Sequence, residues 1–254
     1  MPSYSISTTQ LQDATLMRCY RQEKSKYAAF DFADLDIIFT VALKARDRFP
    51  NINIPGLPNE FQYIERWVHG YYEARNNLPS NRSASPKSAC TDPAIRIIVR
   101  ASQRLSDQQA QHGELFHNLF MSAENIQGNL LEEYIAGKVR RYGFIWCAGN
   151  VLRATDFCNS DGSFLLQVKN KSNTENSSSS TIRDGTSIEK WYRLGSRRRN
   201  GQLVPDFKWD RLNDLISIHR SQGFELPRCR MSEDDYELFL SKIASQNTNL
   251  ITNR

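Results

Sequence analysis

The sequence lacks the features that mark membrane and secreted proteins. None of its 254 residues lies in an apolar run approaching the ~18 residues that a membrane-spanning helix needs. The first ten residues, MPSYSISTTQ, have neither a basic start nor an apolar stretch, so no signal peptide is expected. We therefore expect a cytoplasmic protein with no membrane partner.

Zinc-binding and disulfide patterns are also missing. The five cysteines are scattered along the chain, and no two of them form a CxxC pair. The four histidines do not complete a zinc pattern either. An odd number of separated cysteines fits reduced thiols in a cytoplasmic protein.

The positive charge is concentrated in one segment. Lys and Arg number 33 and Asp and Glu number 28, which gives a formal charge of +5. Residues 181–211 include eight basic and four acidic residues, and so carry +4 of that charge. Within them, Arg197–Arg199 lie between two glycines, a pattern typical of a hairpin tip or an exposed loop. Such a patch suits a polyanion, because cations that meet phosphates release counterions. A solvated charged loop is the alternative.

Hydrophobic periodicity predicts a mainly helical N-terminal part, residues 1–122. Apolar residues recur at helical spacing over 35–43 and 61–72. The aromatic face of the second helix, which includes Trp67, is expected in the core, with a dimer contact as the alternative. The polar connection over 76–93 is either a domain boundary or a surface loop.

The C-terminal part, residues 123–254, combines helices with strands. Turn signals at Gly149-Asn150 and at 160–162 separate three segments of strand character. With no internal repeat visible, we expect one domain spanning 1–254 and of mixed α/β (α+β) class, with a central mixed sheet flanked by helices. The expected strands cover 144–148, 151–157 and 164–170, and the further expected helices cover 95–105, 108–120, 123–136, 208–220 and 232–244.

A cluster of polar residues is expected where two of these strands pair. Asp156 ends one strand, and Gln167 and Lys169 lie on one face of the next. If the strands pair through the 158–163 turn, a carboxylate, an amide oxygen and an ammonium group come together. Hard cations such as Mg²⁺ prefer oxygen ligands, and a lysine beside them could orient a water for attack on a phosphate. An Asp that simply forms a turn is the alternative.

The segments on either side of these strands add to the pattern. Glu132 and Glu133 lie in the helix that leads into the strands, within reach of the same cluster. A run rich in Asn and Ser follows Lys171 and passes into the basic segment. Asn, Gln, Arg and Lys are side chains that read base edges, although a Ser-rich linker has a similar composition.

These blocks resemble a known nuclease family. Asp156 followed by Gln167-Val168-Lys169 is similar to the core of the PD-(D/E)xK nucleases. The stretches GNLLEEYIA, WCAGNVLRATDFC, LLQVKNKSNTENSSSS and RDGTSIEKWYR resemble the central blocks of the SinI family of type II restriction endonucleases. The resemblance covers Gly128 to Leu194, about a quarter of the chain.

The resemblance implies a role for each residue of the cluster. Asp156 matches the metal-binding aspartate and Lys169 the catalytic lysine. Gln167 stands where most members have Asp or Glu, which removes one negative charge. Glu132 is our choice for the helix glutamate, with Glu133 second. We thus expect Asp156, Glu132 and Gln167 to hold the metal and Lys169 to act with them in catalysis.

The family further implies an activity and partners. We expect a Mg²⁺-dependent type II restriction endonuclease that cuts double-stranded DNA at a short near-palindromic sequence, GGWCC (W is A or T). A nearly symmetric site implies a homodimer. A cognate DNA methyltransferase is expected as a genetic partner and not as a bound subunit. The residues expected to contact DNA are Lys171, Asn173, Glu175, Asn176, Arg183, Lys190, Arg193, Arg197, Arg198 and Arg199.

Two other interpretations remain open. A non-catalytic, sequence-specific DNA-binding protein with a degenerate nuclease fold is favoured by Gln167, whereas an intact Asp156 and Lys169 argue against it. A repair-type nuclease that recognises DNA structure is the third. The polar segment 171–199 favours sequence reading over that.

Overall fold

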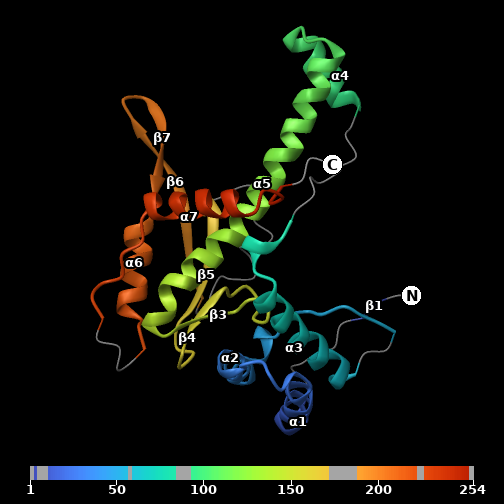
Figure 1. Cartoon of the computed structure of the whole chain (residues 1–254), viewed down its shortest axis with the longest axis vertical. Helices are drawn as coiled ribbons and strands as arrows, with labels where there is room; N and C mark the ends of the chain where they lie inside the picture. Colours follow the sequence, from blue (N-terminus) through green and yellow to red (C-terminus); the bar gives the residue numbers. More distant parts are fainter. Residues whose placement is uncertain are drawn as a thin grey trace.

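The computed structural model describes residues 3–4, 11–56, 59–83, 93–171, 188–221 and 226–251. Helices dominate the N-terminal half and a sheet lies in the C-terminal half (Figure 1). The α-helices are α1 (Asp13–Lys24), α2 (Ala33–Lys44), α3 (Glu60–Asn76), α4 (Pro93–Gln103), α5 (Asp107–Val139), α6 (Trp209–Ile218) and α7 (Glu233–Gln246). The strands are β1 (Ser3–Tyr4), β2 (Ile54–Pro55), β3 (Phe144–Trp146), β4 (Phe157–Asn159), β5 (Leu165–Lys171), β6 (Ile188–Arg199) and β7 (Gln202–Phe207).

The main sheet is mixed, in the order β3-β4-β5-β6-β7. The first three strands form an antiparallel meander, with Phe157 of β4 opposite Leu166 of β5. β5 and β6 run parallel, and β7 returns antiparallel to β6. The expected mixed α/β class, with a helical N-terminal half, is confirmed.

Helices cover both faces of this sheet. Successive residues of a strand point to opposite faces, and β5 follows this rule. Leu165 packs in a cluster with apolar residues of α1, α2 and α3. Leu166 and Val168 pack in a second cluster with α5, α6 and α7. The sheet is therefore held between α1–α3 on one face and α5–α7 on the other. This packing fixes the position of the start of β4, where Asp156 lies.

The N-terminal helices largely follow the sequence pattern. α2 and α3 lie where apolar periodicity predicted helices, and Trp67 is buried, so its expected place in the core is confirmed. The Asn59 side chain accepts a hydrogen bond from the Gln62 N–H and starts α3 with a capping box. The connection after α3 is described only as far as residue 83, and its remainder lies outside the described residues.

Two expectations for the centre of the chain were wrong. Residues 107–139 form the single helix α5, where two shorter helices were expected. No Pro interrupts this segment, and the Ser122 hydroxyl donates to the Asn118 carbonyl within the helix. The expected strand over 151–157 is also absent before Phe157, because Asn150 and Ala154 adopt positive φ and turn the chain.

α4 and the outer half of α5 form a helical arm that projects from the rest of the molecule (Figure 1). None of the helices in the described part of the chain has the length and apolar content needed to cross a membrane.

Candidate active site

Asp156 lies where β4 and β5 begin to pair. Its backbone N–H donates to the Leu166 carbonyl at 2.9 Å, and its Oδ2 accepts from the Val168 N–H at 2.7 Å. The strand register, continued by one residue, sets Asp156 opposite Gln167. The carboxylate is thus fixed by the backbone of β5 beside the Gln-x-Lys segment.

Gln167, opposite Asp156 in this register, is itself buried. The residue is 4% exposed, and among the described residues no hydrogen-bond donor reaches its Oε1. A buried acceptor without a partner costs stability. Such an oxygen is free to act as a ligand for a cation beside Asp156.

Glu132 projects from α5 toward the same place. The Trp146 indole N–H donates to Glu132 Oε2 at 3.2 Å. Burial raises the pKa of Glu132 to about 8, helped by the negative charge of Asp156, while the Trp146 hydrogen bond and the positive charge of Lys169 oppose the rise. Glu132, Asp156 and Lys169 therefore lie within electrostatic range of one another.

Glu133 faces another part of the structure. Its carboxylate accepts hydrogen bonds from the Ser80 backbone N–H at 2.8 Å and from the Ser80 hydroxyl at 2.6 Å. Ser80 follows α3 in a short 3₁₀ turn, so this contact ties the end of α3 to α5. The geometry favours Glu132 over Glu133 as the glutamate beside Asp156.

Both acids, Glu132 and Asp156, line one cavity of about 460 Å³. Three polar residues that sequence reasoning did not single out, Glu73, Arg82 and Asn129, line it as well. They come from α3, the segment after it, and α5, and no local sequence pattern marks them. A larger cavity of about 750 Å³ is lined by neither Asp156 nor Glu132, so size alone does not locate the site.

One wall of the smaller cavity depends on a close backbone contact. Gly149 has φ +77°, and a Cβ there would lie 2.4 Å from the Gly70 carbonyl oxygen of α3. The Trp67 indole N–H also donates to the Val151 carbonyl at 2.8 Å. α3 is therefore held directly against the loop that follows β3, as only glycine at position 149 allows.

The oxygen donors fit a hard divalent cation. Two carboxylates and one amide oxygen are ligands that suit Mg²⁺, which keeps several waters of its own. Over the ranges that the structure describes, no three His, Cys, Asp or Glu side chains are grouped closely enough to hold a metal ion. The fit therefore depends on Gln167, whose unpaired oxygen would be the third protein ligand.

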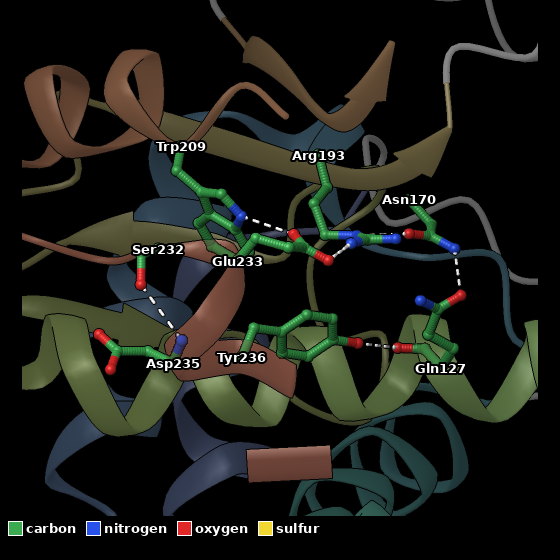
Figure 2. A network of polar contacts seen from close by, with 8 residues as sticks. All are labelled: Gln127, Asn170, Arg193, Trp209, Ser232, Glu233, Asp235 and Tyr236. Atoms are coloured by element: carbon green, nitrogen blue, oxygen red, sulfur yellow. Dashed lines mark hydrogen bonds and ion pairs between the residues drawn. The ribbon is translucent and has the colours of Figure 1, made fainter. Parts of the chain in front are cut away.

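A polar network beyond Lys169 holds the strands and helices together (Figure 2). The Arg193 guanidinium of β6 donates to Asn170 Oδ1 at 2.8 Å and forms an ion pair with Glu233 of α7. Asn170 in turn donates to Gln127 of α5 at 2.6 Å. Arg193, for which the sequence suggested a DNA contact, is 5% exposed, and its guanidinium is engaged by Asn170 and Glu233.

The other residues expected to contact DNA are spread along β5 and β6. Arg197–Arg199 are exposed at the end of the β6–β7 hairpin, whose two turn residues, Asn200 and Gly201, have positive φ. The expected hairpin tip is thus confirmed. Lys171 is exposed and ion-paired with Glu124 at 2.8 Å, and Lys190 is half-buried. Four more lie outside the described residues: Asn173, Glu175, Asn176 and Arg183.

The raised pKa of Glu132 makes the free energy of unfolding depend on pH. Its pKa of about 8 lies above the ordinary 4.5, so the folded protein keeps a proton that the unfolded chain releases. The free energy of unfolding without metal should therefore fall as pH rises from about 4.5 to about 8.

Glu132→Gln removes this titration. In EDTA at pH 8 we expect the variant to be more stable than wild type by roughly 2–4 kcal/mol, and the gain should vanish near pH 5. Thermal unfolding over this pH range measures the difference. An equal gain at pH 5 and pH 8 would contradict a buried, protonated Glu132.

The fold, together with the acidic pair Glu132 and Asp156, defines a class of protein. A five-stranded mixed sheet flanked by helices, with Asp156 just before β4 and Lys169 on the neighbouring β5, is a restriction-endonuclease-like arrangement.

Sequence comparisons agree with this class. The family described as SinI restriction endonuclease matches residues 68–226. The type II restriction enzyme Eco47I of Escherichia coli is 36% identical over 183 residues, which cover 70% of this chain and 71% of the relative. The type II restriction enzyme SinI of Salmonella infantis is 34% identical over 183 residues, with the same coverage.

The chain belongs to the SinI restriction endonuclease family. It is accordingly a type II restriction enzyme, a site-specific deoxyribonuclease that binds double-stranded DNA. Enzymes of this type generally use divalent metal ions.

Proposed function

We propose that this enzyme uses Mg²⁺ to hydrolyse both strands of DNA at the near-palindromic sequence GGWCC. The main support is one cavity lined by both Glu132 and Asp156, together with Gln167, which is opposite Asp156 in the continued strand register and has a buried amide oxygen without a partner. Two carboxyl groups and a free oxygen lone pair form a site that suits a small divalent cation. The target sequence rests on the family resemblance alone.

Four residues divide two roles in the proposed reaction: three bind the metal ion and one acts on the water and the phosphate. Asp156, Glu132 and Gln167 would hold the ion, and a bound ion would supply positive charge to neutralise the phosphate and to lower the pKa of a water. Lys169, exposed just beyond Gln167, positions the attacking water and stabilises charge on the phosphate oxygens. Water attacks phosphorus and loses a proton to solvent, one P–O bond of the backbone breaks, and the leaving oxygen takes up a proton from solvent.

We further propose that residues 1–122 and 123–254 act as one nuclease unit and that the enzyme is a homodimer with one active site for each strand. The N-terminal helices supply part of the site itself, because Glu73 and Gly70 of α3 line the cavity of Asp156. A methyltransferase of the same specificity would protect the host DNA without binding the enzyme.

The direct test is digestion of phage DNA with and without Mg²⁺, followed by sequencing of the fragment ends. Discrete fragments ending at GGWCC only with metal would support the full proposal. Discrete fragments ending elsewhere would keep the enzyme and discard the target sequence. Intact DNA together with tight, specific binding would favour the non-catalytic interpretation, for which the missing charge at Gln167 is the best argument.

The exposed hairpin provides a binding prediction. Replacing Arg197–Arg199 with Gln removes three cations, and each cation that no longer meets a phosphate should reduce the slope of log K against log salt by about 0.9. We expect a slope reduced by about 2–3 if all three bind phosphate, measured by fluorescence anisotropy across salt concentrations. Arg18→Gln with Arg21→Gln on α1 serves as the control for loss of exposed charge. An unchanged slope in the hairpin variant would place the patch away from DNA.

A further inference from the structure

The projecting arm, residues 93–124, has little holding it in one copy of the chain. α4 has no buried residue along its 11 residues. It touches the outer half of α5 through ion pairs at its surface, Arg96 with Glu114 at 3.9 Å and Arg100 with Asp107 at 3.5 Å. An isolated helix shorter than ~12–15 residues is marginal in water, so α4 needs tertiary packing to be stable.

The arm also exposes an unusual amount of apolar surface. Eight large apolar side chains on it are between 40% and 68% exposed. Large exposed apolar side chains in this number are typical of contact sites between proteins. Four of the eight lie on α4 and four on α5: Ile95, Ile97, Ile98, Val99, Leu115, Phe116, Phe120 and Met121.

The charge of the arm argues against a polyanion as the occupant of this surface. α4 and its following loop contain three Arg and no acid, whereas residues 107–124 contain one Asp, two Glu and no Lys or Arg. The arm as a whole has a formal charge of zero, which gives no attraction to DNA or to an anionic membrane. Arg96 and Arg100 already pair with Glu114 and Asp107 within the arm, so its exposed apolar side chains suit a partner that is itself apolar and uncharged overall, as a second copy of the arm is.

The exposed area is of the size that a dimer needs. An aromatic side chain buries ~150–250 Å², so Phe116 and Phe120 at 60% and 68% exposure present roughly 200–320 Å². The six aliphatic side chains add to this area, so the arm approaches the ~800 Å² that each partner buries in a standard interface.

We infer that the arm is the homodimer interface, in which α4 and α5 of one copy pack against α5 and α4 of a second copy of this chain. The four helices would bury their apolar faces together, as in a helical bundle. This inference rests on the proposed function only in its choice of a dimer, because an enzyme that cuts both strands needs two active sites. It assigns the interface to α4 and the outer half of α5, whereas Glu132 of the candidate site lies on the inner half of α5.

The test combines one arm variant with a matched control. Ile98→Glu with Phe120→Glu places two charges at arm positions that are 65% and 68% exposed. Ile218→Glu with Leu238→Glu makes the same changes on α6 and α7, at 72% and 70% exposure. Circular dichroism checks that all three proteins are folded, and light scattering after gel filtration gives their masses across micromolar concentrations.

We expect wild type and the control to have twice the chain mass of 29.3 kDa, and the arm variant to have the single mass. Two charges buried in an apolar interface should raise the dimer dissociation constant by about 100-fold or more. A wild-type protein that stays monomeric, or an arm variant that stays dimeric, would overturn the inference.

Plasmid cleavage, measured separately, distinguishes this inference from the proposed function. A dimer that depends on the arm but does not cut DNA would leave the interface standing and reject the nuclease mechanism. Double-strand cleavage by a monomeric wild type would support the nuclease mechanism and reject the arm interface.

Discussion

Asp156→Asn is expected to reduce DNA cleavage by roughly 10³-fold or more, because losing metal-based stabilisation of the transition state removes several kcal/mol. Asn keeps an oxygen that can still accept the Val168 N–H, now bonded to Asp156 Oδ2 at 2.7 Å. The substitution therefore removes the charge while leaving the strand pairing intact. Single-turnover cleavage of a short GGWCC duplex in Mg²⁺ measures the effect.

Two further measurements make this result specific. Mg²⁺ should raise the melting temperature of wild type, since a ligand that binds only the folded state stabilises it, and this rise should disappear in Asp156→Asn. Asp210→Asn, an exposed Asp on the first turn of α6, provides the matched control. Wild-type cleavage by Asp156→Asn would remove this carboxylate from the metal site.

The sequence predicted β3 and β5 because their chemistry is local. β5 alternates Leu165, Gln167 and Lys169 on one face with Leu166 and Val168 on the other, and the structure keeps that alternation. The turn before it contains Gly162 with positive φ, as the turn signal indicated. Fold class and the pairing across this turn follow from such short-range patterns, whereas β6 and β7 were not among the expected strands.

The chain just before Asp156 could not be predicted in the same way. Val151 and Leu152 have strand character, yet both are buried in the cluster of the N-terminal helices. The Arg153 N–H donates to the Arg48 carbonyl at 2.7 Å, far back in the sequence. Contacts with distant helices override the local preference here, and periodicity holds no information about them.

The same reason explains which site residues were missed. Glu73 and Asn129 line the cavity of Asp156 only because α3 and α5 meet there. Arg193 shows the opposite case, since its place in a basic segment suggested DNA binding. In the fold it is buried against Glu233 of α7, a partner that no spacing in the sequence indicates.

Lys169→Ala is expected to separate chemistry from binding. The side chain is exposed, so its removal should change the free energy of unfolding by at most ~0.5 kcal/mol. Removing one group that stabilises charge in the transition state typically lowers kcat by ~10²–10³-fold. Lys169 opposes the raised pKa of Glu132, so its loss should also shift that pKa further upward.

The variant should still bind its target DNA specifically and still gain stability from Mg²⁺, because the oxygen ligands are untouched. Lys242→Ala, an exposed lysine on α7, controls for the loss of one surface charge and should cleave as wild type does. Single-turnover cleavage, anisotropy and thermal unfolding together give the three readouts. Lost cleavage with retained binding and metal response would assign Lys169 to the chemical step. Retained cleavage would assign the water-positioning role to another group in the cavity, of which Arg82 is the cation already lining its wall.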